Sequence, residues 1–404
     1  MKKVLTTLLI AAAALVCANA TVPHKFAIPD IPGYVTLKGD FHVHTVFSDD
    51  TSWPTSRIDE AYYDGLDVIS ITDHCDTRHR HMVKKGYFNP ETCTRNASYE
   101  IALDRAKRYG IIVLHGAELT RGERLFPGHF NAHFLQDGDV LATKMEAQDP
   151  QFAKDKDKTL REETALLNGL KEARAQGAFL VWNHPNWEPQ EPNEVVWHPF
   201  HEKVYKAGLM DGIEIENHSV GFCPEAFHWA MEKNLTIVSG TDCHVPMNQL
   251  VDYELGEFRP FTLIFATERS EKAVREALDN HRTAVCVNGS VYGKEEFLKP
   301  LLKGILSEGK ISYSAKKIAI KVKNTSSVPV CLRKGPRCES LVMDRVLTIN
   351  PGEECSIGIS AAHGASHFAS NEFEVNFYVE NFLTDVDAPV LMSYKVSLPE
   401  KYRK

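Results

Sequence analysis

Several features that mark other classes of protein are scarce or missing in this sequence of 404 residues. After residue 20, no apolar run reaches the roughly 18 residues that a membrane-spanning helix needs, so no transmembrane segment is predicted. Lysine and arginine (46) are outnumbered by aspartate and glutamate (54), and the resulting net charge of −8 argues against binding of nucleic-acid polymers. No glycine-rich GxGxxG turn follows a predicted strand, so a dinucleotide-binding fold has no support.

Cysteine is also sparse. The chain has nine cysteines and no CxxC motif, which excludes a small disulfide-stapled scaffold and a thiolate-rich structural zinc site. Cys75 and Cys243 each directly follow a residue with metal-ligand character. We expect both to be small buried side chains, and the alternative is a disulfide near the site.

The first twenty residues have the pattern of a signal peptide. Lys2 and Lys3 precede an apolar stretch over residues 4–16, which is too short to span a bilayer, and Ala18-Asn19-Ala20 is a small-x-small cleavage site. We therefore expect cleavage after Ala20 and a mature protein that is exported, either periplasmic or secreted. The oligomeric state is left open.

Residues 21–297 alternate short apolar runs with helical stretches, which predicts an α/β domain built as a barrel or an open parallel sheet. The predicted strands are 68–72, 111–114, 178–182, 212–216 and 235–239. The predicted helices are 56–63, 99–109, 159–176 and 224–233.

Residues 298–404 have a different pattern, in which polar and apolar residues alternate along short segments. This period of two predicts a small all-β, sandwich-like domain. The predicted strands are 311–314, 316–324, 346–349, 372–379 and 392–398. All five tryptophans precede residue 230, so this domain shows no aromatic surface for stacking on sugars.

The abundant feature is histidine, and its distribution is uneven. Of 18 histidines, 15 lie between His24 and His244. Many stand at the ends of predicted strands, where barrel enzymes collect their reacting groups. A single histidine at a strand end is usually structural, but five such ends carrying His or Glu together favour a polynuclear metal site. Imidazole and carboxylate ligands suit zinc, manganese or iron.

The strand-end motifs resemble, in order and spacing, those of the PHP (polymerase and histidinol phosphatase) superfamily. The motifs are His42-Val43-His44 with Asp49, Thr72-Asp73-His74, Gly116-Ala117-Glu118, Asn183-His184-Pro185 and Thr241-Asp242-Cys243-His244. The resemblance covers roughly residues 36–290 and implies a distorted (β/α)7 TIM-like barrel that holds two or three divalent metal ions and hydrolyses phosphoesters. The common SDG element reads Ser48-Asp49-Asp50 here, which keeps the aspartate and puts only the loop shape in doubt.

The resemblance also implies a ligand set. The first ion would be held by His42, His44, Glu118 and Asp242. Glu118 would bridge to a second ion bound by His184 and His129, with His133 as the alternative to His129. The third ion would be held by Asp49, His74 and His244. His129 is preferred because it resembles the GHxNA element of exported relatives.

These residues suggest a mechanism. A hydroxide bridging two ions is a nucleophile at neutral pH, because bound cations lower the pKa of water toward about 7. Glu118 and Asp242 would act in catalysis by holding the ions, and His218 would protonate the leaving group. Arg57, Arg78, Arg80 and Arg121 are candidates for binding phosphate, although each taken alone is more simply a solvated surface residue. His79, His81, His198 and His201 are interpreted as surface residues.

The leading hypothesis is an exported metal-dependent phosphoesterase acting on a small-molecule phosphomonoester, phosphodiester or phosphonate ester. The first alternative is an amidohydrolase-like enzyme that cleaves C–N or carboxyl ester bonds. That class is expected to carry a carboxylated lysine at a strand end, and no lysine occupies one. The second alternative is a non-catalytic metal-binding or adhesive protein, which the retention of every ligand position disfavours.

Overall fold

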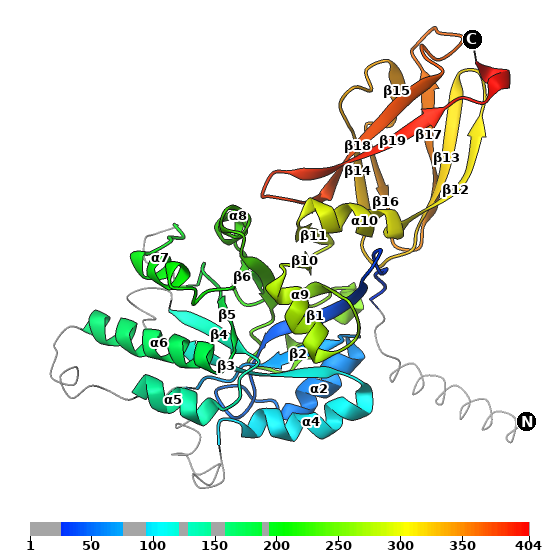
Figure 1. Cartoon of the computed structure of the whole chain (residues 1–404). Helices are drawn as coiled ribbons and strands as arrows, with labels where there is room; N and C mark the ends of the chain where they lie inside the picture. The colour runs from blue at the N-terminus through cyan, green and yellow to red at the C-terminus, as the bar shows by residue number, and fades with distance from the viewer. Residues whose placement is uncertain (1–25, 76–93, 121–127, 147–157, 188–193, 404) are drawn as a thin grey trace, which may run out of the picture.

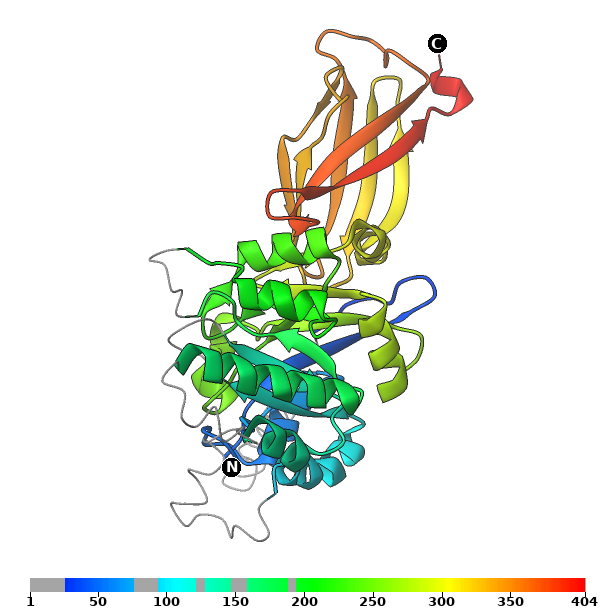
Figure 2. The ribbon, with the colours of Figure 1, turned by 60° about the vertical axis from the view of Figure 1, so that its left-hand side comes forward.

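The computed structural model describes residues 26–75, 94–120, 128–146, 158–187 and 194–403 and shows a mixed α/β protein (Figure 1). Its largest sheet contains the parallel strands, and helices lie around them. The strands that follow residue 305 stand apart at one end of the molecule in both views, and the C-terminus lies at their far end (Figures 1 and 2).

Seven strands carry the motifs of the N-terminal part or lie between them. They are β1 (Val35–Val43), β2 (Val68–Ile71), β3 (Ile112–Thr120), β4 (His129–His133), β5 (Phe179–Trp182), β6 (Gly212–Asn217) and β8 (Thr236–Gly240). The pairs β1–β2, β2–β3, β5–β6 and β6–β8 are parallel, whereas β4 runs antiparallel to β3 and β5. A parallel bridge between Val43 and Cys243 brings the start of the loop after β8 beside the end of β1. Most of these strands are buried on both faces, as their nearly continuous apolar sequences predict.

Helices lie around these strands, and several begin at proline or end at glycine. They are α2 (Pro54–Tyr63), α4 (Ala97–Tyr109), α5 (Gly138–Glu146), α6 (Lys158–Ala175), α7 (Pro199–Lys206), α8 (Pro224–Lys233) and α9 (Glu271–Asp279). Proline occupies the first turn of α2, α7 and α8, where its missing N–H has no helical partner. Gly110 ends α4 in the left-handed conformation at φ 68°, which glycine adopts without a steric penalty.

A run of antiparallel strands joins the two parts of the chain. It consists of β9 (Phe261–Ala266), β10 (Thr283–Val287) and β11 (Ser290–Gly293), while the short β7 (Gly221–Phe222) forms a hairpin with β6. β9 pairs with β1, and β11 pairs with a strand of the C-terminal part, so one sheet continues from one part into the other. The helix α10 (Glu295–Ile305) follows, and the predicted domain boundary at 297/298 falls inside it.

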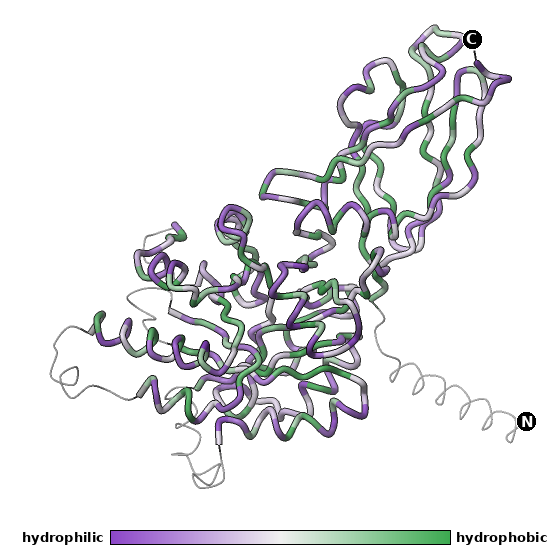
Figure 3. Tube along the Cα trace, in the orientation of Figure 1, coloured by the Kyte–Doolittle hydropathy of each residue, from purple (hydrophilic) through white to green (hydrophobic). Residues whose placement is uncertain are grey.

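The C-terminal part consists of two antiparallel sets of four strands. One set is β12 (Leu306–Tyr313), β13 (Lys317–Asn324), β17 (Glu354–Ala361) and β15 (Leu341–Met343). The other is β16 (Val346–Ile349), β14 (Val330–Lys334), β18 (Glu372–Leu383) and β19 (Pro389–Ser397). In β13 the buried residues Ile318, Ile320 and Val322 alternate with more exposed ones, and Figure 3 shows hydrophobic and hydrophilic residues alternating along this part of the trace. The buried side chains of both sets belong to one apolar cluster.

Most predicted elements are present, with instructive differences. The predicted helix 159–176 corresponds to α6, but the strand predicted over 111–114 continues to Thr120 and therefore includes Glu118. In the C-terminal part the structure adds three strands to the five predicted, namely β14, β15 and β17. Among the described helices, none combines the length and apolar composition that crossing a bilayer requires.

Candidate metal centre

Nine side chains that the sequence predicts as ligands lie together where the parallel strands end. They form four overlapping groups, and within each group the donor atoms lie within 4.8 Å of one another. The groups are His42–His44–Glu118, His42–His184–Asp242, Glu118–His129–His184 and His44–Asp49–His74–His244. We refer to these nine residues (His42, His44, Asp49, His74, Glu118, His129, His184, Asp242 and His244) as the candidate metal centre.

His42 and His44 supply two nitrogens from the end of β1. They are two positions apart on an extended chain, so both imidazoles point to the same side. Their Nε2 atoms lie 3.1 Å from each other, and Asp242 Oδ1 lies 3.3 Å from the first and 3.0 Å from the second. Both histidines are fully buried. Two imidazole nitrogens converging on one carboxylate away from water form a donor set that suits a divalent cation.

Glu118 lies at the middle of the candidate metal centre and is only 1% exposed. Five histidine nitrogens surround its carboxylate, at distances of 2.7 to 3.6 Å: those of His42, His44, His74, His129 and His184. Burial alone would raise the pKa of Glu118, but the charges of His74 and His129 outweigh burial and hold that pKa well below its usual value. The carboxylate therefore stays ionised at neutral pH, as a bridging ligand must.

The three ligands predicted for the third ion lie in one group with His44, which the resemblance gives to the first ion. Asp49 approaches His74 Nε2 at 3.4 Å and His244 Nε2 at 3.3 Å, and His44 joins this group through its Nδ1, 3.6 Å from Asp49. Burial lowers the pKa of His44 to about 4, and the neighbouring His244 and His74 add to that effect. His44 thus presents a neutral imidazole between two groups of donors.

Two members of the candidate metal centre have unusual backbone conformations. His184 has φ 27° and Asp242 has φ 50°, in the left-handed region that residues other than glycine rarely adopt. Hydrogen bonds hold both: the His184 N–H donates to Glu214 Oε2 at 2.8 Å, and the Asp242 N–H donates to the His42 carbonyl at 2.8 Å. Backbone strain of this kind gathers at functional sites, where the surrounding structure enforces it.

The structure separates His129 from its alternative, His133. His129 Nδ1 lies 2.7 Å from Glu118 Oε1, within the centre. His133 lies at the other end of β4, where its Nδ1 is 2.8 Å from Ser70 Oγ and its ring packs edge-on against Phe41. Burial lowers the pKa of His133 to about 3, so it is a neutral core histidine. It belongs to none of the four groups among the described residues.

Arg57, a predicted candidate for binding phosphate, is not a solvated surface residue. It is buried at 1% exposure and forms ion pairs with Asp50 and Glu60. Its guanidinium also donates to the backbone carbonyls of His44, Cys243 and Val245. All of its charge is therefore used to hold the loops that carry the ligands.

Two further histidines that the sequence singled out, His218 and His201, lie in different surroundings. His218 is half-buried, its backbone N–H donates to the Gly240 carbonyl, and it belongs to none of the ligand groups found among the described residues. His201 is fully buried and stacks on Trp182 with ring centroids 3.8 Å apart, so its interpretation as a surface residue was wrong.

Cys75 and Cys243 are both buried, and Cys243 is a free thiol. Burial raises the pKa of Cys243 to about 11. The expectation of small buried side chains is met for both residues, and for Cys243 the alternative of a disulfide is not. Five further candidates lie outside the described residues: Arg78, His79, Arg80, His81 and Arg121.

The sequence prediction missed the residues that support the ligands. Glu214, in the middle of β6, contacts His42 and His184, and Asn217 donates to Asp242 Oδ2 at 3.2 Å. Trp187 packs against the rings of His129 and His184, with centroids 4.8 and 5.4 Å away. One signal was present in the sequence: Gly-Ile-Glu-Ile-Glu-Asn places two carboxylates in an otherwise apolar strand, where a charge requires a partner.

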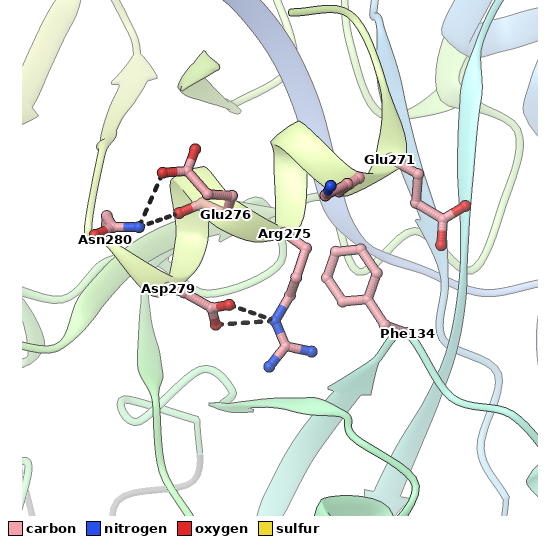
Figure 4. Close-up of a pocket in the computed structure, with 7 residues that line it drawn as sticks. Phe134, Glu271, Arg275, Glu276, Asp279 and Asn280 are labelled. Carbon is pink, nitrogen blue, oxygen red and sulfur yellow. Dashed lines mark hydrogen bonds and ion pairs between the residues drawn. The ribbon is translucent and has the colours of Figure 1, made fainter. Parts of the chain in front are cut away.

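A surface pocket away from the candidate metal centre has a different lining. It lies against α9 and is lined by Phe134, Glu271, Lys272, Arg275, Glu276, Asp279 and Asn280 (Figure 4). Arg275 pairs with Asp279 and lies over the ring of Phe134, at 5.4 Å from its centroid. This pocket contains none of the nine candidate ligands.

Comparison with known proteins identifies one solved structure that is similar over nearly the whole chain. No family model matches the chain, and no curated protein is significantly similar to it. The crystal structure of a two-domain protein from Bacteroides vulgatus, containing a predicted PHP-like metal-dependent phosphoesterase, is 34% identical in sequence. The match covers 93% of this chain and 99% of that chain, with a TM-score of 0.80.

Two further solved structures are less similar. A candidate metal-dependent phosphoesterase from Bifidobacterium adolescentis is 18% identical, with a TM-score of 0.36 over 52% of this chain and 88% of that chain. An amidohydrolase from Chromobacterium violaceum is 16% identical, with a TM-score of 0.34 over the same shares of the two chains. Similarity at this level adds nothing to the assignment, which depends on the first match and on its nearly complete coverage of both chains. The chain belongs to the family of two-domain, PHP-like metal-dependent phosphoesterases.

Proposed function

We propose that the protein is a metal-dependent phosphoesterase that hydrolyses a small-molecule phosphomonoester or phosphodiester. One observation carries this proposal: the buried Glu118 carboxylate is shared by five histidines that extend into separate groups of donors. A single carboxylate between several sets of imidazoles is the arrangement expected of a bridging ligand in a polynuclear site. Membership of the PHP-like family supports the phosphoester substrate.

The four groups suggest how two or three divalent ions, of zinc, manganese or iron, would be held. The first ion would take His42, His44, Glu118 and Asp242, and the second would take Glu118, His129 and His184. The third would take Asp49, His74 and His244, with His44 close enough to contribute. We further propose that β1 to β6 and β8 form the distorted seven-stranded barrel of this family, since the Val43–Cys243 bridge joins the end of β1 to the residues that follow β8.

In the proposed mechanism the bound ions would activate a water molecule as the nucleophile and polarise the phosphoryl group. The side chains of the protein prepare that site. Burial would raise the pKa of Asp242, but His42 and His44 outweigh burial and hold that pKa well below its usual value, so the carboxylate remains charged. Asn217, which donates to Asp242, fixes its orientation. His218 follows Asn217 on the same turn and is our candidate for protonating the leaving group.

We also retain the proposal that the chain is exported. It is supported by the charged start, the apolar stretch and the small-x-small site within residues 1–20. We propose in addition that residues 298–404 form a β-sandwich domain, for which the two antiparallel sets of strands and their common apolar cluster are the support.

The function is tested with a panel of substrates and a matched metal-free sample. Purified protein loaded with zinc, manganese or iron is assayed on aryl phosphate monoesters, phosphate diesters and carboxyl esters, alongside protein stripped with a chelator. We expect hydrolysis of at least one class of phosphoester by the loaded sample only. Cleavage of carboxyl esters without any cleavage of phosphoesters would show that the assignment is wrong and would favour the amidohydrolase-like alternative.

A further inference from the structure

Glu214 touches the candidate metal centre without belonging to it. It lies on β6, is 2% exposed, and directs its two carboxylate oxygens to different partners. Oε1 lies 3.3 Å from His42 Nδ1. Oε2 accepts the backbone N–H of His184 at 2.8 Å and the side-chain amide of Asn217 at 3.1 Å. The side chain thereby contacts two candidate ligands and a residue that orients a third.

We propose that Glu214 is a positioning residue that sets the geometry and the metal affinity of the centre, an inference that rests on the metal-dependent function proposed above. Its contact with His42 determines which nitrogen of that ring carries the proton. When Nδ1–H donates to Glu214, Nε2 keeps its lone pair and points toward His44 and Asp242. A metal-binding histidine typically donates its other N–H to a carboxylate in this way, which fixes the tautomer and the ring orientation.

The contact with His184 has a second consequence. The N–H that Glu214 accepts belongs to a residue with φ 27°, a conformation that is unfavourable for a side chain other than glycine. Without that acceptor, the backbone of His184 would be free to return to an ordinary conformation and carry the imidazole away from Glu118 and Asp242. Glu214 therefore connects the ligands contributed by β1 with those that follow β5.

Gly240 provides independent support, because the surrounding backbone is built to fit this carboxylate. A Cβ atom at Gly240 would clash with the Cβ of His42 and with Oε1 of Glu214. Any larger residue at this position would push the two apart. Glycine at 240 is thus required by the His42–Glu214 contact rather than by its own backbone conformation, since Gly240 is not among the residues with positive φ.

The substitution Glu214→Gln tests the proposal with almost no change of shape. The carboxylate accepts from three donors, one on Oε1 and two on Oε2. If the new amide NH2 faces His42, that ring must accept at Nδ1 and carry its proton on Nε2, where an ion would bind. In the opposite orientation the NH2 group would face two other donors, the N–H of His184 and the side-chain amide of Asn217, and both hydrogen bonds would be lost. Either orientation damages the centre. Glu216→Gln is the matched control, on the same strand and similarly buried, and none of the described hydrogen bonds joins its carboxylate to a candidate ligand.

The measurement is a chelator competition on wild-type, Glu214→Gln and Glu216→Gln proteins loaded with zinc, with the zinc that remains bound determined by elemental analysis. We expect Glu214→Gln to lose zinc at a chelator concentration about 10 to 100 times lower than the wild type, and Glu216→Gln to match the wild type. Thermal melting of the metal-free proteins provides a separate readout of fold. Equal zinc retention by Glu214→Gln and the wild type would overturn the proposal, as would an equal loss in Glu216→Gln.

A second variant covers the case in which Glu214→Gln fails to fold. Gly240→Ala leaves the carboxylate in place but separates it from His42, and we expect it to weaken zinc retention in the same direction. Wild-type retention by Gly240→Ala would contradict the proposal. The outcome also remains distinct from that of the proposed function. A wild-type protein that binds zinc but cleaves no phosphoester overturns only the function, whereas a wild-type protein that binds none of zinc, manganese and iron overturns both.

Discussion

The two parts of the molecule bury polar groups in opposite ways. In the N-terminal part, ionisable side chains such as His42, His44 and Glu118 lie at 0–1% exposure and face one another. In the described residues from 306 onward, the buried polar side chains are Asn324, Ser326 and Asn376, and none is charged. Asn324 illustrates how these are satisfied: its amide donates to the carbonyls of Val328 and Ile349.

This difference suggests that the buried polar residues of the first part serve function and that those of the second part serve stability. Removing charged groups from water is unfavourable by several kcal/mol for each ion, so a crowd of buried histidines and carboxylates persists only where it has a task. Neutral amides that bond to nearby carbonyls have no such requirement, and they fix turns between strands. We therefore expect substitutions of the candidate ligands to remove function and substitutions of buried residues in the C-terminal part to lower stability alone.

The largest effect is expected from Glu118→Ala. Removing the carboxylate shared by five histidines should abolish turnover and reduce the number of ions bound, while the fold survives because β3 keeps its strand pairing. Hydrolysis rate, metal content and circular dichroism check the three parts of this expectation. Activity near that of the wild type would show that the bridging role is wrong.

The next effect concerns stability within the N-terminal part. Arg57→Met leaves Asp50 buried without its partner, and we expect the free energy of unfolding to fall by about 3–5 kcal/mol. The matched control is Arg333→Met, which breaks an ion pair with Glu380 that is 41% exposed on both sides; there we expect a change of about 0–1 kcal/mol. Denaturant unfolding measures both. Unchanged stability together with a raised KM in Arg57→Met would restore the original prediction that Arg57 binds phosphate.

The junction between the two parts provides a prediction of similar or smaller size. Phe382 is fully buried where β18 pairs with β11, and Phe382→Ala should lower the free energy of unfolding by about 3–5 kcal/mol. Val346→Ala, at 61% exposure in the same sheet, should change it by about 0.5 kcal/mol or less. Metal content should equal that of the wild type in both. A loss of bound ions in Phe382→Ala would mean that the C-terminal part supports the centre as well as stability.

A smaller effect is expected from pH. Burial lowers the pKa of His74, but Glu118 and Asp49 outweigh burial and raise it to about 10; His42 is raised for similar reasons by Asp242 and Glu214. Both histidines therefore carry protons at neutral pH in the metal-free protein and must release them to bind an ion. Affinity should rise by about tenfold per pH unit for each proton displaced, between pH 6.5 and 8.5. Titration calorimetry in buffers of different ionisation enthalpy measures the protons released, and an affinity that does not change with pH would contradict this account.

The candidate ligands could be proposed from the sequence because their placement is local. His42 and His44 follow from a period of two on one strand, and the other ligands follow from the strand ends. Glu214 was not predictable in the same way. Its contact with His42 spans 172 residues and depends on the close approach of β6, β8 and β1. Arg57 was misjudged for the same reason, since its local sequence is that of an exposed first helical turn and its partner carbonyl at Cys243 lies 186 residues away.

The fold was predicted where the hydrophobic pattern is regular and missed where it is not. The helix α6 has a clear helical pattern and was placed to within one residue at each end. The strand β14 was missed because it is only five residues long and ends in Arg333 and Lys334, which weaken the alternation. Its place in the sheet is set by pairing with β16 and β18 rather than by its own sequence.

The central claim is that the nine residues of the candidate metal centre hold ions that are needed for phosphoester hydrolysis. Its most direct test is the metal content of the wild-type protein, measured with phosphoester turnover before and after removal of the ions with a chelator. We predict two or three ions per chain, loss of turnover on their removal, and recovery when zinc, manganese or iron is returned. A protein that binds no ions when they are supplied, or that hydrolyses phosphoesters equally well without them, would contradict the account.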